Sequence, residues 1–110
     1  MIIRAKLPGD RRTRAVELST GHFPKGFLDE SRVIDGFFRI CAYEYGAVLI
    51  RIGGDEKPAQ EFWEKVLFRD GIEMYKWLLA FHQWCREQKL DVIVADRDAD
   101  ELPGLPTFDW

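Results

Sequence analysis

Four stretches of the chain have the pattern of hydrophobic and polar positions that is typical of β-strands. Residues 2–7 and 15–19 alternate in part between apolar and polar side chains and contain β-branched residues. Residues 47–52, with the sequence AVLIRI, form an apolar run that predicts a buried strand. Residues 91–95, with the sequence DVIVA, form a second such run, which we expect in the interior of a sheet.

The segment 28–45 fits two different patterns. Its apolar residues share one face of a helix that would begin at Asp29 and end at Gly46. Its aromatic and β-branched residues instead favour a short helix over residues 28–34, closed by Gly36 and followed by a pair of strands. Periodicity favours the first interpretation and residue propensity favours the second, so both remain open at this point.

The C-terminal half predicts two consecutive helices. Pro58 suits the first turn of a helix over about 58–69, and the residues RDG separate it from a longer helix over 72–89. We therefore expect an α+β fold, in which a small mixed β-sheet of 3–5 strands is packed by these two helices and completed by the strand 91–95. At 110 residues, the chain 1–110 predicts a single domain.

The helix predicted at 72–89 has an apolar face much wider than one sheet requires. Only a narrow stripe of about 80° is polar, so this helix needs a cover on two sides. Either the preceding helix supplies the second cover, or a homodimer or another protein partner does. Because large aromatic residues anchor interfaces well, we consider an aromatic binding surface. Its candidate residues are Trp63, Trp77, Phe81, Trp84, Phe108 and Trp110.

Composition and charge exclude several classes of protein. The chain has no apolar run long enough for a membrane span, no signal peptide and only two cysteines, so we expect a soluble, cytoplasmic protein. The net charge of -3 argues against a nucleic-acid partner. The first 26 residues nevertheless carry six basic and two acidic groups, whereas the last 20 carry one and six. The candidate basic patch consists of Arg4, Arg11, Arg12 and Arg14.

The segment 97–110 is an acidic tail with three prolines or glycines and an aromatic end. It has the parts of a docking peptide, and it is similar in kind to the acidic tail of bacterial single-stranded DNA-binding proteins. Its four large apolar residues favour the alternative, in which the tail is ordered and packs on its own domain or on a second copy.

Two carboxylates stand at the carboxyl end of the strand 91–95, where α/β folds place their sites. Asp96 and Asp98 could hold Mg²⁺ together with Asp55 or Glu56. This Asp-x-Asp strand resembles that of the TOPRIM domain of topoisomerases and primases, and the resemblance implies magnesium-dependent phosphoryl transfer. The chain departs from that family at residues 53–54, where Gly-Gly stands in place of Glu-Gly.

No complete catalytic set or cofactor motif is present in the sequence. His82 and Cys85 are three residues apart, but the histidine and cysteine that would complete a zinc site, His22 and Cys41, are distant in sequence, so core positions are the better interpretation. We therefore expect no cofactor and a non-enzymatic binding protein of the inhibitor, immunity or bacterial or phage accessory type. The alternative is a magnesium-dependent phosphoryl-transfer enzyme that uses Asp96.

Overall fold

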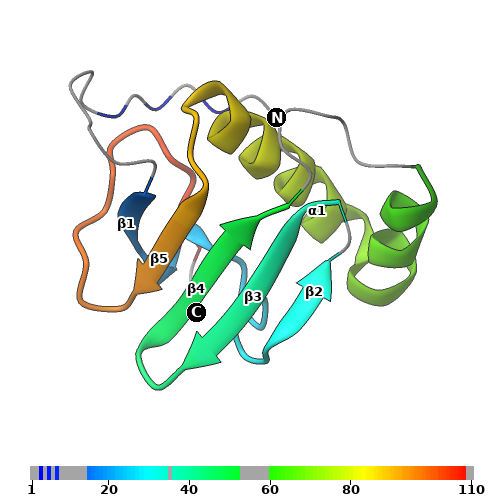
Figure 1. Cartoon of the computed structure of the whole chain (residues 1–110), viewed down its shortest axis with the longest axis horizontal. Helices are drawn as coiled ribbons and strands as arrows, with labels where there is room; N and C mark the ends of the chain where they lie inside the picture. The colour runs from blue at the N-terminus through cyan, green and yellow to red at the C-terminus, as the bar shows by residue number, and fades with distance from the viewer. Residues whose placement is uncertain are drawn as a thin grey trace.

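The computed structural model describes residues 3, 5, 7, 15–34, 36–52 and 60–108, with the side chains of 60–63 and 65 excepted. One five-stranded sheet lies against one long helix (Figure 1). The elements in chain order are β1 (Ala15–Ser19), the 3₁₀ turn η1 (Thr20–His22), β2 (Arg32–Ile34), β3 (Phe38–Tyr43), β4 (Gly46–Arg51), α1 (Gln60–Glu87) and β5 (Val92–Asp96).

The strand order in the sheet is β1-β5-β4-β3-β2, and the sheet is mixed. β1 pairs with β5 in parallel, and the other neighbouring strands are antiparallel. The small mixed sheet of an α+β fold is therefore confirmed, and the strand predicted at 91–95 lies in the sheet interior as expected. This strand, β5, lies between β1 and β4, and its alternate residues Ile93 and Ala95 are fully buried on the face that packs against α1.

The two predicted helices are not separate elements, because one α-helix, α1, runs from Gln60 to Glu87 in the described part of the chain. Its kink lies at Gly71, where φ is 86° and ψ is 173°, values that are not helical and that glycine adopts at little cost. The RDG sequence thus interrupts the helical backbone where a boundary was predicted, and the two helical parts meet at this kink without an intervening loop. Asp70, next to the kink, forms an ion pair of 3.2 Å with Arg32 of β2, which fastens the bend to the edge of the sheet.

Residues 36–51 form the pair of strands that residue propensity favoured. β3 and β4 are joined by a two-residue turn, and Tyr43 pairs with Gly46 at its base. The single helix over 28–45 is wrong, and so is the short helix over 28–34, since this segment consists of turns followed by β2. Residues 2–7 lie largely outside the described residues, and Ile3, Ala5 and Leu7, which are described, belong to no strand.

An aromatic cluster fills the space between α1 and the segments that cover it. Trp77 and Phe81 stack at 5.1 Å between ring centroids, and Phe27 meets Trp77 edge-on at 4.8 Å. Phe23 lies edge-on to both Trp77 and Phe81. On the same helix, the indole N–H of Trp84 donates to the carbonyl oxygen of Ala5 at 2.8 Å. Most of the wide apolar face of α1 is therefore covered by the sheet on one side and by irregular segments of the same chain on the other, while Ile72 stays 53% exposed.

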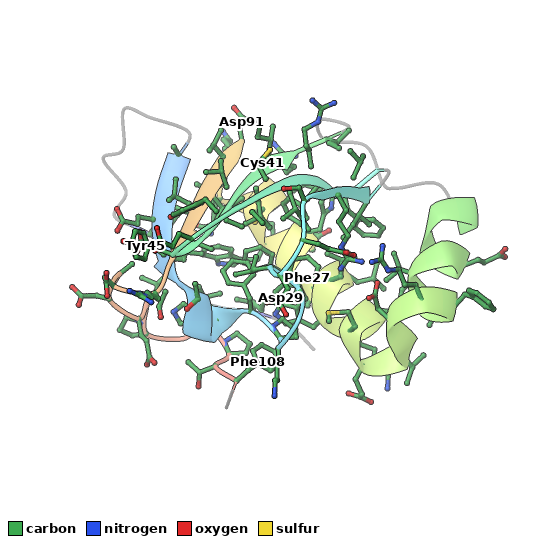
Figure 2. The ribbon with its side chains drawn as sticks, turned by 90° about the horizontal axis from the view of Figure 1, so that it is seen from below. Phe27, Asp29, Cys41, Tyr45, Asp91 and Phe108 are labelled. Atoms are coloured by element: carbon green, nitrogen blue, oxygen red, sulfur yellow. The ribbon has the colours of Figure 1, made fainter. Side chains whose placement is uncertain are left out.

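The C-terminal segment packs on the domain and is fastened by one histidine. Nε2 of His22 accepts the backbone N–H of Leu102 at 2.8 Å, so the ring proton sits on Nδ1, which donates to the carbonyl of Pro106 at 2.9 Å. His22 is 1% exposed and Leu105 is 7% exposed. Phe108 lies edge-on to Trp77. In Figure 2, Phe108 and Cys41 lie at opposite sides of the molecule.

No helix in the described part of the chain has both the length and the hydropathy that crossing a membrane requires.

Candidate functional site

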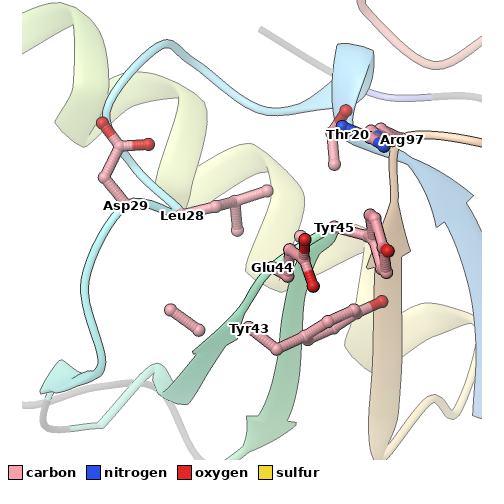
Figure 3. A pocket seen from close by; sticks show the side chains of 9 residues that line it. Thr20, Leu28, Asp29, Tyr43, Glu44, Tyr45 and Arg97 are labelled. Carbon is pink, nitrogen blue, oxygen red and sulfur yellow. The ribbon is translucent and has the colours of Figure 1, made fainter.

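A cleft opens at the edge of the sheet where β1, β5 and β3 end (Figure 3). Its volume is about 310 Å³. Four separate segments line it: η1, the loop before β2, the turn between β3 and β4, and the residue after β5. The lining residues are Thr20, Leu28, Asp29, Ala42, Tyr43, Glu44, Tyr45, Gly46 and Arg97.

One row of the sheet builds the floor of the cleft. Tyr43 of β3 pairs with Gly46 of β4, which pairs with Asp96 of β5. The Tyr43 ring crosses this row, and its hydroxyl donates to the Asp96 carboxylate at 3.1 Å. Gly46 lies close to the backbone of β5: its φ is 156°, and a Cβ would stand 1.8 Å from the carbonyl oxygen of Ala95. The missing side chain at Gly46 therefore lets β4 and β5 approach each other at the cleft.

The two tyrosines of the cleft differ in electrostatic environment. Desolvation raises the pKa of Tyr43, and the hydrogen bond and negative charge of Asp96, followed by the charge of Glu17, raise that pKa further. Tyr43 is therefore a neutral hydrogen-bond donor throughout the physiological range. Tyr45 instead lies under the guanidinium of Arg97, 4.6 Å from the ring centroid. Arg97 also donates its backbone N–H to the carbonyl of Tyr45 at 3.0 Å, which holds the turn against the end of β5.

Carboxylates outnumber cations around the cleft. Asp29 and Glu44 are exposed members of its lining, Asp96 lies beneath Tyr43, and Arg97 is the one cation among the lining residues. Carboxylates beside half-exposed phenol rings make a site that attracts a cation through charge and through the ring faces. The cleft is therefore chemically suited to a guanidinium or ammonium group.

The predicted magnesium ligands do not assemble in the described residues. Asp96 lies at the carboxyl edge of the sheet, but its two oxygens accept the backbone N–H of Asp98 at 2.8 Å and the hydroxyl of Tyr43. Asp98 is exposed, and Asp55 and Glu56 lie outside the described residues. Among the residues that the structure describes, no three His, Cys, Asp or Glu side chains come together as a metal site would require.

The histidines and cysteines are dispersed. His82 and Cys85 are buried between α1 and the sheet, His22 fastens the C-terminal segment, and Cys41 is exposed on the other face of the sheet. Burial lowers the pKa of His82 to about 4, helped by the positive charges of Arg51 and Arg86 and opposed by a hydrogen bond to the backbone of Ile52. Burial raises the pKa of the Cys85 thiol, so this thiol stays protonated and unreactive.

The aromatic residues considered for an interface lie mostly inside the molecule. Trp77, Phe81 and Trp84 are at most 1% exposed, so this fold does not present them to a partner. Phe108 is half-buried against the same cluster. The side chain of Trp63 and the whole of Trp110 lie outside the described residues, as do the four arginines of the basic patch, Arg4, Arg11, Arg12 and Arg14.

Sequence reasoning missed every residue that lines the cleft. The available signals were the acidic residue between two tyrosines in the turn at 43–46 and the arginine between Asp96 and Asp98. Neither signal points to a site by itself, because the cleft forms only when the sheet register brings the two turns together.

The sequence model of one protein family matches residues 15–110, and its description is "Family of unknown function (DUF5983) C-terminal domain". No curated protein and no solved structure matches the chain. Because the match extends over every strand and the helix of the sheet-and-helix fold, this chain belongs to the DUF5983 family.

Proposed function

We propose that this protein is a non-enzymatic binding protein of the inhibitor, immunity or accessory type, and that its cleft takes up a basic segment of a partner protein. The observation that carries the proposal is the combination of Asp29, Glu44 and two half-exposed tyrosines around one cleft. Tyr43 and Tyr45 are 40% and 42% exposed. In this proposal, Tyr43 and Tyr45 provide the aromatic contacts that the sequence analysis had assigned to other aromatic residues, among them Trp77 and Trp84 of α1.

Size and charge support a basic side chain as the occupant. A volume of about 310 Å³ is at the lower end for a small-molecule site and accommodates one or two long side chains. The segment after β5 adds Asp98, Asp100 and Glu101 to the carboxylates of this edge, so the local potential favours cations. The planar guanidinium of Arg97 stacks on the ring of Tyr45 and occupies that ring face. The incoming cation would therefore bind at the exposed ring of Tyr43.

The experiment is an anisotropy titration of the full chain with a labelled peptide of alternating arginine and glycine. We expect Asp29→Asn and Glu44→Gln each to weaken binding by about two- to fivefold, as for partly exposed charge pairs. The matched control is Glu64→Gln, which removes one exposed carboxylate on α1, outside the cleft lining. In an ¹⁵N spectrum, the peptide should shift the amides of Tyr45 and Arg97.

Two outcomes of the titration would refute the proposal. If Glu64→Gln weakens binding as much as the cleft variants do, only net charge attracts the peptide. If the peptide does not bind, or if a glutamate–glycine peptide binds as well, the cleft does not recognise cations.

A further inference from the structure

The face of the sheet that points away from α1 carries a compact group of aliphatic side chains on β4 and β5, two of its three interior strands. Val48 pairs with Val94, and Ile50 pairs with Val92, so these four residues form an apolar square across β4 and β5. Ile50 is 41% exposed, and the three valines are half-buried. Val33 of β2, 51% exposed, lies on the same face but is separated from the square by Arg39 of β3.

Such a face is unusual for a sheet that has solvent on one side. Antiparallel sheets with one solvated face alternate between apolar and polar residues, whereas strands covered on both faces are apolar throughout. The strands β4 and β5 are of the second kind, and among the elements that the structure describes, α1 covers the face of Leu49 and Ile93 alone. The sequence of these strands therefore requires a second cover over the apolar square.

Two opposite charges flank the apolar square at diagonal corners. Glu17 of β1 pairs with Val94, and Arg39 of β3 pairs with Ile50, so each charged residue borders the square from a different side. Both are exposed, and neither forms an ion pair with another described residue. A face-to-face dimer has its two-fold axis between the copies and parallel to the sheets. When this axis is perpendicular to the line from Glu17 to Arg39, it exchanges these two corners. It therefore brings Glu17 of one copy toward Arg39 of the other.

We propose that a second copy of this chain packs face to face on this sheet, with the apolar square at the centre of an isologous interface. The self-complementary arrangement of Glu17 and Arg39 selects a second copy over a partner of different sequence, since each ion pair occurs twice by symmetry. The two squares bury each other and supply the hydrophobic contribution. Cys41, which pairs with Val48 on the same face, lies beside the square and is covered on association.

The test is the association constant of the full chain by sedimentation equilibrium, over a wide range of protein concentration. We expect a dimer for the wild type. Glu17→Arg and Arg39→Glu should each weaken the dimer by at least about tenfold, because each places two like-charged pairs in the interface. The double variant should recover most of the loss. Glu64→Arg, an exposed charge reversal on α1, is the matched control and should leave the dimer unchanged.

A second readout is the reaction of Cys41 with a thiol reagent, because buried Cys85 does not react. We expect the rate to fall as the protein concentration rises and the dimer forms. A wild type that stays monomeric at high concentration refutes the proposal and leaves the face to a different partner or a further domain. Single reversals without effect, or a double variant that does not recover, refute it as well.

Discussion

Leu105 provides the sharpest test of how the C-terminal segment contributes to the fold. Its side chain is 7% exposed, and its backbone N–H donates to the carbonyl of Leu102 at 3.2 Å, closing a turn. His22 fastens the same segment at Leu102 and Pro106. The perturbation is Leu105→Ala, which removes the buried aliphatic group and leaves every one of these backbone hydrogen bonds in place.

The expected loss follows from the burial of that one side chain. Replacement of a buried leucine by alanine costs about 2–5 kcal/mol, and the cost is smallest where the surroundings can close on the cavity. Leu105 lies on a terminal segment without strand or helix, which can move inward, so we expect about 2 kcal/mol. A domain of this size has about 5–15 kcal/mol of stability in total. The variant therefore folds, but with a clearly lower free energy of unfolding.

Urea unfolding followed by tryptophan fluorescence measures this change. Trp77 lies against Phe108 of the same segment, so its fluorescence also reports the state of that segment in the native protein. With a denaturant dependence of about 2 kcal/mol per M, the midpoint should fall by about 1 M urea. Thr107→Ala, at an exposed position of the segment, is the control and should stay within about 0.5 kcal/mol of the wild type.

A Leu105→Ala midpoint equal to that of the wild type would contradict the packing argument. The segment would then contribute nothing to stability, and the docking-peptide interpretation of its acidic and aromatic residues would be the better one. A lower midpoint with a changed denaturant dependence would instead indicate that the variant no longer unfolds in two states.

Two further predictions concern the sheet and the helix. Gly46→Ala should unfold or strongly destabilise the domain, since its Cβ would stand 1.8 Å from the carbonyl oxygen of Ala95. Thermal unfolding measures the loss of stability. A melting temperature within a few degrees of that of the wild type would show that β4 and β5 do not approach each other as closely as described. The neutral His82 has a folded pKa of about 4 against 6.5 in the unfolded chain, so the unfolded state takes up a proton first as the pH falls. Stability should therefore drop by about 2–3 kcal/mol between pH 6.5 and pH 4, and His82→Leu should lose that part of the pH dependence in urea unfolding series. An unchanged slope in His82→Leu would assign the acid sensitivity to other groups.

The sequence predicted the strands well where one physical cause dominates. β1, β4 and β5 fall within one residue of the predicted segments 15–19, 47–52 and 91–95, because apolar β-branched runs bounded by turns have few other conformations. The segment 28–45 was ambiguous because helical periodicity and strand propensity conflicted. The structure resolved that conflict in favour of propensity, with Gly36 and Gly46 both at positive φ in the turns that flank β3.

Two features could not be predicted from the sequence, for the same physical reason. One is the set of loop residues that covers the apolar face of α1, and the other is the cleft. Both depend on irregular segments, which have no periodicity to read. The aromatic residues Phe23 and Phe27 cover Trp77 from a loop, so the apolar arc that indicated a partner is satisfied within the chain. The cleft needs Tyr43 and Asp96 in one row of the sheet, and that register follows from the whole topology rather than from either segment.

The two proposed surfaces are adjacent but leave room for each other. Tyr43 stands two residues beyond Cys41 along β3, which is about 7 Å further toward the edge than the apolar square. An interface that ends at the row of Cys41 and Val48 leaves the ring of Tyr43 exposed. Glu44 lies in the turn and Asp29 in a loop, both beyond the end of the strands. A dimer would carry two open clefts, so a partner with two basic segments would bind it with the gain that linked sites provide. Charge reversals at Glu17 or Arg39 should then weaken binding of such a bivalent partner far more than binding of a single basic peptide.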